Sequence, residues 1–138
     1  MNIEDCIKEG FLQKVEPKKD VIKKEFKEAD YDLEKAVVAL EEKDFKWSII
    51  KSYYSMFHSA RALLFSLGLK ERRHFVIRIV LEDLYKKGKL EGKYVSDFNA
   101  ALSGREDADY RYTYSEETAI YLIEAARNFL NKMKQMVK

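Results

Sequence analysis

The sequence is poor in cysteine and histidine, and each shortage excludes a class of protein or site. A single cysteine, Cys6, in 138 residues excludes an internal disulfide, so nothing indicates a secreted protein. With only 2 histidines, the chain has no Cys or His pair at metal-ligand spacing and no Cys–His nucleophile pair. It also lacks a glycine-rich phosphate loop and a serine elbow. We therefore expect no metal site and no cofactor.

Long apolar runs and an N-terminal targeting pattern are missing as well. No run approaches the roughly 20 residues that a membrane-spanning helix needs. The first residues include Glu4, Asp5, Lys8 and Glu9, which is not the profile of a signal peptide. We therefore expect a cytoplasmic protein that does not enter a membrane.

Net charge of one sign is also nearly absent. The 26 basic and 24 acidic residues leave a formal charge of +2, so the overall balance does not indicate nucleic-acid binding, and any basic site must be local. Lysine and glutamate dominate the charged residues while glutamine is scarce. That composition is typical of heat-adapted proteins and predicts a thermophilic source.

The scarcity of chain-breaking residues predicts an all-α fold. Only 1 proline and 5 glycines interrupt the chain, and alternating β-branched runs are few. We expect one domain, residues 1–138, folded as an up-and-down antiparallel bundle of four to five long helices with a short N-terminal helix. The expected helices are about Ile3–Lys14, Lys19–Lys43, Asp44–Gly68, His74–Lys87, Lys93–Ser103, and a last one that begins after Ser115.

The third expected helix stands out because it has no formal charge between Lys51 and Arg61. At 3.6 residues per turn it carries two stripes, one of polar and aromatic side chains and the other of small side chains. The first consists of Trp47, Tyr54, His58, Arg61 and Phe65, and the second of Ser48, Ser52, Ser55, Ser59 and Ala62. We therefore predict a central, buried helix whose serine stripe lets a neighbouring backbone approach closely.

Tyr54, His58 and Arg61 are the first candidate site. Their spacing places a phenol, an imidazole and a guanidinium one turn apart on the same face. Burying such groups is costly unless they bond one another or face a wet cleft. They form either a satisfied internal network that fixes the helix register, or a site in which His58 titrates near neutrality beside a bound anion.

A second candidate site is the basic segment Lys70-Glu71-Arg72-Arg73-His74, just before or at the start of the fourth helix. Cations at a helix N-terminus oppose the helix dipole unless an anion is recruited to the exposed amides. The segment is thus either a phosphate site or a solvated turn.

The third candidate site follows the fifth expected helix. Arg105 continues the inward spacing of Phe98 and Ala101, so its guanidinium should point into the bundle and need a partner. That partner is either Asp109, four residues on, or a phosphate held against the third helix. The nearby tyrosines either stack bases or cover the core; they are Tyr110, Tyr112 and Tyr114.

The second and last expected helices carry long apolar seams. In the last helix, apolar residues repeat at heptad spacing from Ala119 to Val137. This surface predicts a homodimer through helix faces, unless both seams are buried within one chain.

Several segments together resemble the HEPN superfamily, named for higher-eukaryote and prokaryote nucleotide-binding domains. They are Tyr53–Leu64, the later His74, and Arg105 through Asp109-Tyr110. The resemblance is greatest to the small stand-alone archaeal and bacterial branch, and it covers the chain from about the second helix onward. It implies a dimeric helical bundle, often the partner of a minimal nucleotidyltransferase in a toxin–antitoxin pair.

The resemblance also implies where catalytic residues would fall, since many members are metal-independent ribonucleases. Their signature is an arginine followed, after four to six intervening residues, by a histidine that moves the proton of the ribose 2′-hydroxyl, while the arginine steadies the phosphate. Arg105 matches the arginine, but Tyr110, Arg111 and Tyr112 stand where the histidine would be. A tyrosine, with a pKa of about 10, is a poor base at neutral pH, which argues against the usual ribonuclease route.

We therefore predict a dimeric HEPN-like bundle that binds RNA, a nucleotide or a partner nucleotidyltransferase. Arg105 and Arg61 would supply positive charge, and Tyr54, His58 and Tyr110 would orient the ligand. One alternative is an endoribonuclease that uses His58 or Tyr110 in place of the missing histidine. The other is a structural, antitoxin-like protein whose arginines only pair with carboxylates.

Overall fold

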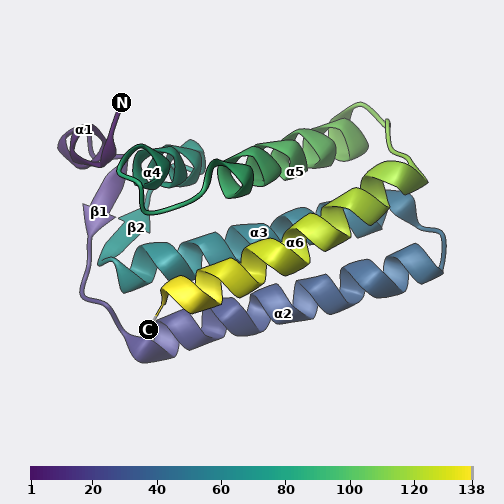
Figure 1. Ribbon diagram of the computed structural model, residues 1–138, viewed down its shortest axis with the longest axis horizontal. Helices are drawn as coiled ribbons and strands as arrows, with labels where there is room; N and C mark the ends of the chain where they lie inside the picture. The colour runs from purple at the N-terminus through teal and green to yellow at the C-terminus, as the bar shows by residue number, and fades with distance from the viewer. Residues whose placement is uncertain (138) are drawn as a thin grey trace.

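The computed structural model describes residues 1–137 and confirms a helical bundle (Figure 1). The described elements, in chain order, are α1 (Ile3–Lys8), β1 (Leu12–Lys14), α2 (Lys19–Glu41), α3 (Phe45–Ser66), β2 (Leu69–Glu71), α4 (Phe75–Lys86), α5 (Gly92–Tyr110) and α6 (Glu116–Met136). Helices α2, α3, α5 and α6 lie lengthwise, and successive long helices run in opposite directions. Helix α4 crosses one end of this bundle, beside α1.

Helix α3 is the centre of the bundle, as its sequence predicts. It packs against α2, α5 and α6, and it contributes more residues to the buried core than any other element. Asp44 caps its first turn by accepting a hydrogen bond from the amide of Trp47 at 3.2 Å. Gly68 follows its end with φ of 74°, a conformation that favours glycine.

The serine stripe of α3 faces α2. The hydroxyl of Ser48 donates to the carbonyl of Ala36 at 2.9 Å, and that of Ser55 donates to the carbonyl of Ala29 at 2.8 Å. Both alanines have no exposed surface. The small side chains on each side let the two backbones approach, and this part of the sequence-based prediction is confirmed.

The predicted first helix is wrong beyond Lys8. The chain turns at Gly10, where φ is 79°, and residues Leu12–Lys14 then pair with β2 in an antiparallel register that aligns Leu12 with Glu71. Pairing with a strand 57 positions later overrides the local helical pattern, because it buries Leu12 and satisfies backbone groups. The fold is therefore helical with one small ribbon added.

The predicted end of the fifth helix at Ser103 is also wrong, because α5 continues to Tyr110. Gly104 lies inside the helix, where it lets α6 approach. A Cβ atom there would lie 2.9 Å from Leu122 Cδ1 and 3.5 Å from Ile49 Cγ2. The glycine is needed for close packing, and the helix carries Arg105 and Tyr110 on one rigid element.

Replacing Gly104 by valine should destabilise the protein by about 2 kcal/mol, because the added atoms overlap the packed Leu122 side chain. Thermal unfolding followed by circular dichroism measures the change. Ser103→Val is the matched control, since Ser103 is exposed and serine and valine have similar helix propensity. Equal melting temperatures for the two variants would contradict close packing at Gly104.

The apolar seams of α2 and α6 are largely buried within the chain. Phe26, Leu33 and Leu40 of α2 pack against the core, and residues from Ala119 to Met133 of α6 belong to it. The surface that suggested a homodimer is thus mostly used internally, and the homodimer stays a prediction. Within residues 1–137, no helix has the length and apolar character needed to cross a bilayer.

Candidate functional site

Arg105 projects from α5 into a group of three tyrosines. Its guanidinium carbon lies 5.8 Å from the ring centroid of Tyr53, 5.7 Å from that of Tyr54 and 5.4 Å from that of Tyr110. Its Nη2 donates to the hydroxyl of Tyr54 at 3.3 Å and to that of Tyr110 at 3.5 Å. Both distances are long for hydrogen bonds, so the cation is held mainly by the aromatic faces. We call these four residues the Arg105 cluster.

The charge of Arg105 is incompletely neutralised. The nearest carboxylate oxygen, Asp109 Oδ2, is 3.6 Å from Nη2, so the predicted partner is present but not tightly bonded. The buried Nε has no hydrogen-bond partner among residues 1–137. Desolvation opposes ionisation, but the surrounding phenols and Asp109 outweigh it and raise the pKa of Arg105 above its ordinary value. The site therefore holds a permanent cation with free hydrogen-bonding capacity.

Tyr53 forms the buried wall of the cluster, and only 5% of its surface is exposed. Burial, which outweighs the opposing charge of Arg105, raises the pKa of Tyr53 to about 12. Its hydroxyl is therefore protonated at neutral pH and can donate a hydrogen bond. Sequence reasoning missed this residue as a site member, because a tyrosine in an apolar helix looks like ordinary core.

His58 and Arg61 turn toward carboxylates from other elements. His58 Nδ1 lies 2.8 Å from Glu25 Oε2, and its Nε2 lies 3.7 Å from Asp32 Oδ2. Arg61 Nη1 donates to Glu25 Oε1 at 3.1 Å. Its Nε is 2.9 Å from Glu71 Oε2, close enough for an ion pair although the N–H does not point along a hydrogen bond. We call these five residues the Glu25 network.

The Glu25 network agrees with the first of the two interpretations of the polar stripe on α3, in which its side chains are held by bonds within the protein. Burial raises the pKa of Asp32, and the nearby His58 counteracts this in part. The pKa of Asp32 is therefore higher in the folded protein than in the unfolded chain. As the pH rises and Asp32 ionises, the protein loses stability. The stripe predicted as one site is thus divided, since Tyr54 contacts Arg105 while His58 and Arg61 contact α2 and β2. The ring of Phe57 contacts both groups.

Replacing Glu25 by alanine should lower the free energy of unfolding by about 2 kcal/mol, because Arg61 and His58 lose the partly buried carboxylate they share. Chemical denaturation gives the value. Glu28→Ala, an exposed glutamate one turn along α2, should change it by less than about 0.5 kcal/mol. If neither variant changed stability, the structural role of the network would be contradicted.

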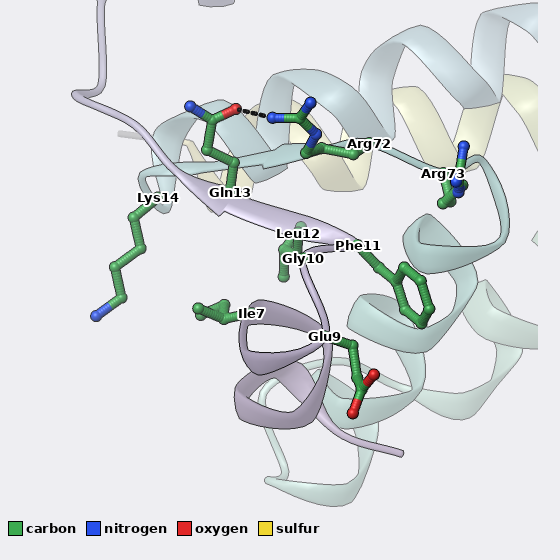
Figure 2. Close-up of a pocket in the computed structure, with 9 residues that line it drawn as sticks. All are labelled: Ile7, Glu9, Gly10, Phe11, Leu12, Gln13, Lys14, Arg72 and Arg73. Atoms are coloured by element: carbon green, nitrogen blue, oxygen red, sulfur yellow. Dashed lines mark hydrogen bonds between the residues drawn. The ribbon is translucent and has the colours of Figure 1, made fainter.

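The basic segment Lys70–His74 does not form one site. Lys70 and Glu71 belong to β2, whereas Arg72 and Arg73 line a cavity of about 680 Å³ beside β1 and the end of α1 (Figure 2). Arg72 Nη1 donates to Gln13 Oε1 at 3.4 Å across the ribbon. A role for both arginines in phosphate binding stays a prediction.

His74 lies elsewhere, at the N-terminal end of α4. Its ring stacks on that of Phe57, with the centroids 5.0 Å apart and an angle of 28° between the planes. The structure therefore separates it from the two arginines that precede it in sequence and places it on the aromatic core of α3.

Exposed tyrosines stand at and just after the C-terminal end of α5, where Tyr110 belongs to the Arg105 cluster. Tyr110 and Tyr112 are 65% and 77% exposed, and Tyr112 adopts a left-handed φ of 54°, which is uncommon for a tyrosine. Lys46 Nζ lies 5.8 Å from the ring centroid of Trp47 and 5.9 Å from that of Tyr112. Tyrosines that only covered the core would be buried; these two rings are open to solvent.

Comparisons with known proteins agree on one protein family. The model of the HEPN domain matches residues 22–136. A Methanocaldococcus jannaschii protein named "Putative toxin MJ0142" is 28% identical over 117 residues, covering 83% of this chain and 80% of that protein. A second protein of that organism, "Putative toxin MJ0605", is 30% identical over 112 residues, covering 80% and 84%.

A solved structure gives the same result for the fold. The crystal structure of ST0689, described as an archaeal HEPN homologue, superimposes with a TM-score of 0.62 at 22% identity, covering 85% of this chain and 98% of that one. The region matched by the HEPN family model begins within α2 and ends with α6, and α1 and β1 precede it. The resemblance inferred from Tyr53–Leu64 and the Arg105 segment is therefore confirmed, and this chain belongs to the HEPN domain family.

Proposed function

We propose that this chain is a toxin-like HEPN protein that binds RNA, with Arg105 as the group that contacts a phosphate. The observation that carries the proposal is the incomplete pairing of Arg105. The Arg105 side chain is 21% exposed and its carboxylate partner is no nearer than 3.6 Å, so the exposed part of this cation is suited to an incoming anion, while its buried Nε has no partner in the described chain. Tyr54 and Tyr110 would keep the guanidinium in place through its aromatic contacts.

RNA is favoured over a free nucleotide by the exposed rings at and just beyond the end of α5. Tyr110 and Tyr112 are largely exposed, and Lys46 lies near Tyr112. Exposed aromatic side chains beside cations are the usual means of holding single-stranded nucleic acid, because bases stack on the rings while phosphates meet the charges. One nucleotide would leave most of this surface unused.

The setting we propose is a toxin–antitoxin pair, since two relatives that match over 80% or more of this chain carry the name of toxins. A minimal nucleotidyltransferase is the expected partner. Binding rather than cleavage is the expected activity, because Arg105 lacks the following histidine and both ring nitrogens of His58 face carboxylates. His58 is therefore oriented toward α2 instead of toward Arg105.

The test is a fluorescence-anisotropy titration of the wild-type protein with labelled single-stranded RNA at several salt concentrations. We expect saturable binding that weakens as salt rises, because phosphate contacts release counterions. A duplex of the same sequence should bind more weakly, and a gel of the same mixtures in chelator should show intact RNA. Absence of binding at low salt would overturn the proposal, and cleavage in chelator would favour the endoribonuclease alternative.

A further inference from the structure

A small cavity lies beside the Arg105 cluster, between α3, α4 and α5. Its volume is about 210 Å³, below the roughly 300 Å³ at which pockets for drug-sized ligands begin. It therefore has room for one ring system and not for a whole nucleotide. Its lining residues are Tyr53, His74, Phe75, Arg78, Phe98 and Leu102.

The cavity and the Arg105 cluster are continuous. Tyr53 belongs to both, since it lines the cavity and its ring is 5.8 Å from the guanidinium carbon of Arg105. On α5, Leu102 comes three residues before Arg105, so the two side chains share a face of the helix. A ligand in the cavity would thus have a cation next to it on the α5 side.

The inner wall of the cavity is aromatic and includes the phenol of Tyr53. Tyr53 and Phe98 are 5% and 2% exposed, with ring centroids 6.0 Å apart. Arg105 donates hydrogen bonds to Tyr54 and Tyr110 but not to Tyr53, whose hydroxyl stays protonated at neutral pH because burial raises the pKa of Tyr53 to about 12. A flat ring with polar edges would gain both stacking and a hydrogen bond there.

A second cation, on α4, lines the cavity itself. Arg78 is exposed on α4 and forms no ion pair within the described residues, and His74 stands one turn before it. The cavity therefore has Arg78 in its own lining and Arg105 beside Tyr53, one of its aromatic residues. A single terminal phosphate would use only one of these cations, whereas an internal nucleotide of a strand has a phosphate on each side.

We propose that this cavity holds one unstacked base of a single-stranded RNA, whose flanking phosphates are contacted by Arg105 and Arg78. The inference rests on the proposed function, because it names the part of the RNA that enters the protein beside Arg105. It adds Arg78, Tyr53 and Phe98 to the binding surface.

The experiment compares a labelled single-stranded RNA with the same strand carrying abasic residues, in the anisotropy assay above. We expect the abasic strand to bind about tenfold more weakly, because base–aromatic stacking is lost. Arg78→Ala should weaken binding of the intact strand and reduce the slope of log affinity against log salt by about 0.7, the value for one phosphate contact on a single strand. Lys86→Ala is the matched control on α4, an exposed cation outside the cavity lining.

The outcomes separate the two proposals. If wild-type protein binds no RNA, the proposed function and this inference both fail. If it binds RNA but Arg78→Ala behaves like Lys86→Ala, the base pocket is overturned and the function at Arg105 stands. Equal binding of the abasic strand would overturn the base pocket and also base stacking on Tyr110 and Tyr112, and would leave only the phosphate contact of Arg105. Arg78 is exposed, so its replacement should not prevent folding, and circular dichroism checks this.

Discussion

Arg105→Ala is expected to weaken the binding of single-stranded RNA by about tenfold or more, with a smaller salt dependence. The guanidinium is the cation at the centre of the tyrosine cluster, and a hydrogen bond to a charged phosphate contributes about 1.5–3 kcal/mol. Alanine removes the charge and both long contacts to Tyr54 and Tyr110. Anisotropy titrations at two or more salt concentrations measure the affinity and the slope.

Arg111→Ala is the control for this prediction. Arg111 follows the same helix, is largely exposed and pairs with Asp107 at 2.9 Å, so its charge is already satisfied. We expect the affinity for RNA to change by less than about fivefold, the equivalent of the roughly 1 kcal/mol that bounds a surface ion pair. Equal losses for the two variants would show that Arg105 acts only through general charge.

Ser55→Leu is expected to destabilise the protein by about 3 kcal/mol or more, the largest stability effect that we predict. The Ser55 hydroxyl contacts the backbone of α2 at Ala29, so a larger side chain must push the two helices apart. For a chain of this size, the melting temperature should fall by roughly 10 °C. Thermal unfolding followed by circular dichroism provides the value.

Ser55→Ala separates packing from hydrogen bonding at the same position. It keeps the helices close and removes only the bond to the Ala29 carbonyl, which should cost about 1 kcal/mol. A leucine variant as stable as the alanine variant would contradict the close approach of α2 and α3.

The parts of the structure that the sequence predicts are those set by local spacing. Helix α3 and its serine stripe follow from 3.6-residue periodicity, and Asp44 and Gly68 mark its ends as expected. Arg105, Asp109 and Tyr110 lie within about one turn, so their proximity is a property of one helix.

The parts that could not be predicted depend on contacts distant in sequence. Glu25 contacts His58 from another helix. It is one of many glutamates on a charged helix face, and its position in the sequence does not distinguish it from the others. The ribbon forms because Leu12 pairs with Glu71, whereas local pattern alone favoured a helix. Gly104 was expected after a helix end, and only the position of Leu122 explains why glycine is needed inside one.

The Glu25 network distinguishes Arg61 from Arg105, the two arginines that the sequence predicts to act together. Arg61 has carboxylate oxygens at 3.1 and 2.9 Å, whereas the oxygen nearest Arg105 Nη2 on an acidic side chain is at 3.6 Å. Because an incoming phosphate competes with existing partners, Arg105 is the better candidate to contact a phosphate, and Arg61 is the better candidate for a structural role. This contrast is why the proposed function relies on Arg105.

The side-chain Nε–H resonance of Arg105 tests the account most directly. This group is buried and without a partner in the described chain, so its proton should be observable by ¹H–¹⁵N NMR, and Arg105→Lys assigns the signal by removing it. Adding single-stranded RNA should shift this resonance in a saturable way, with the affinity found by anisotropy. RNA that binds and shifts other signals while the Arg105 Nε–H stays unchanged would contradict the central role of Arg105.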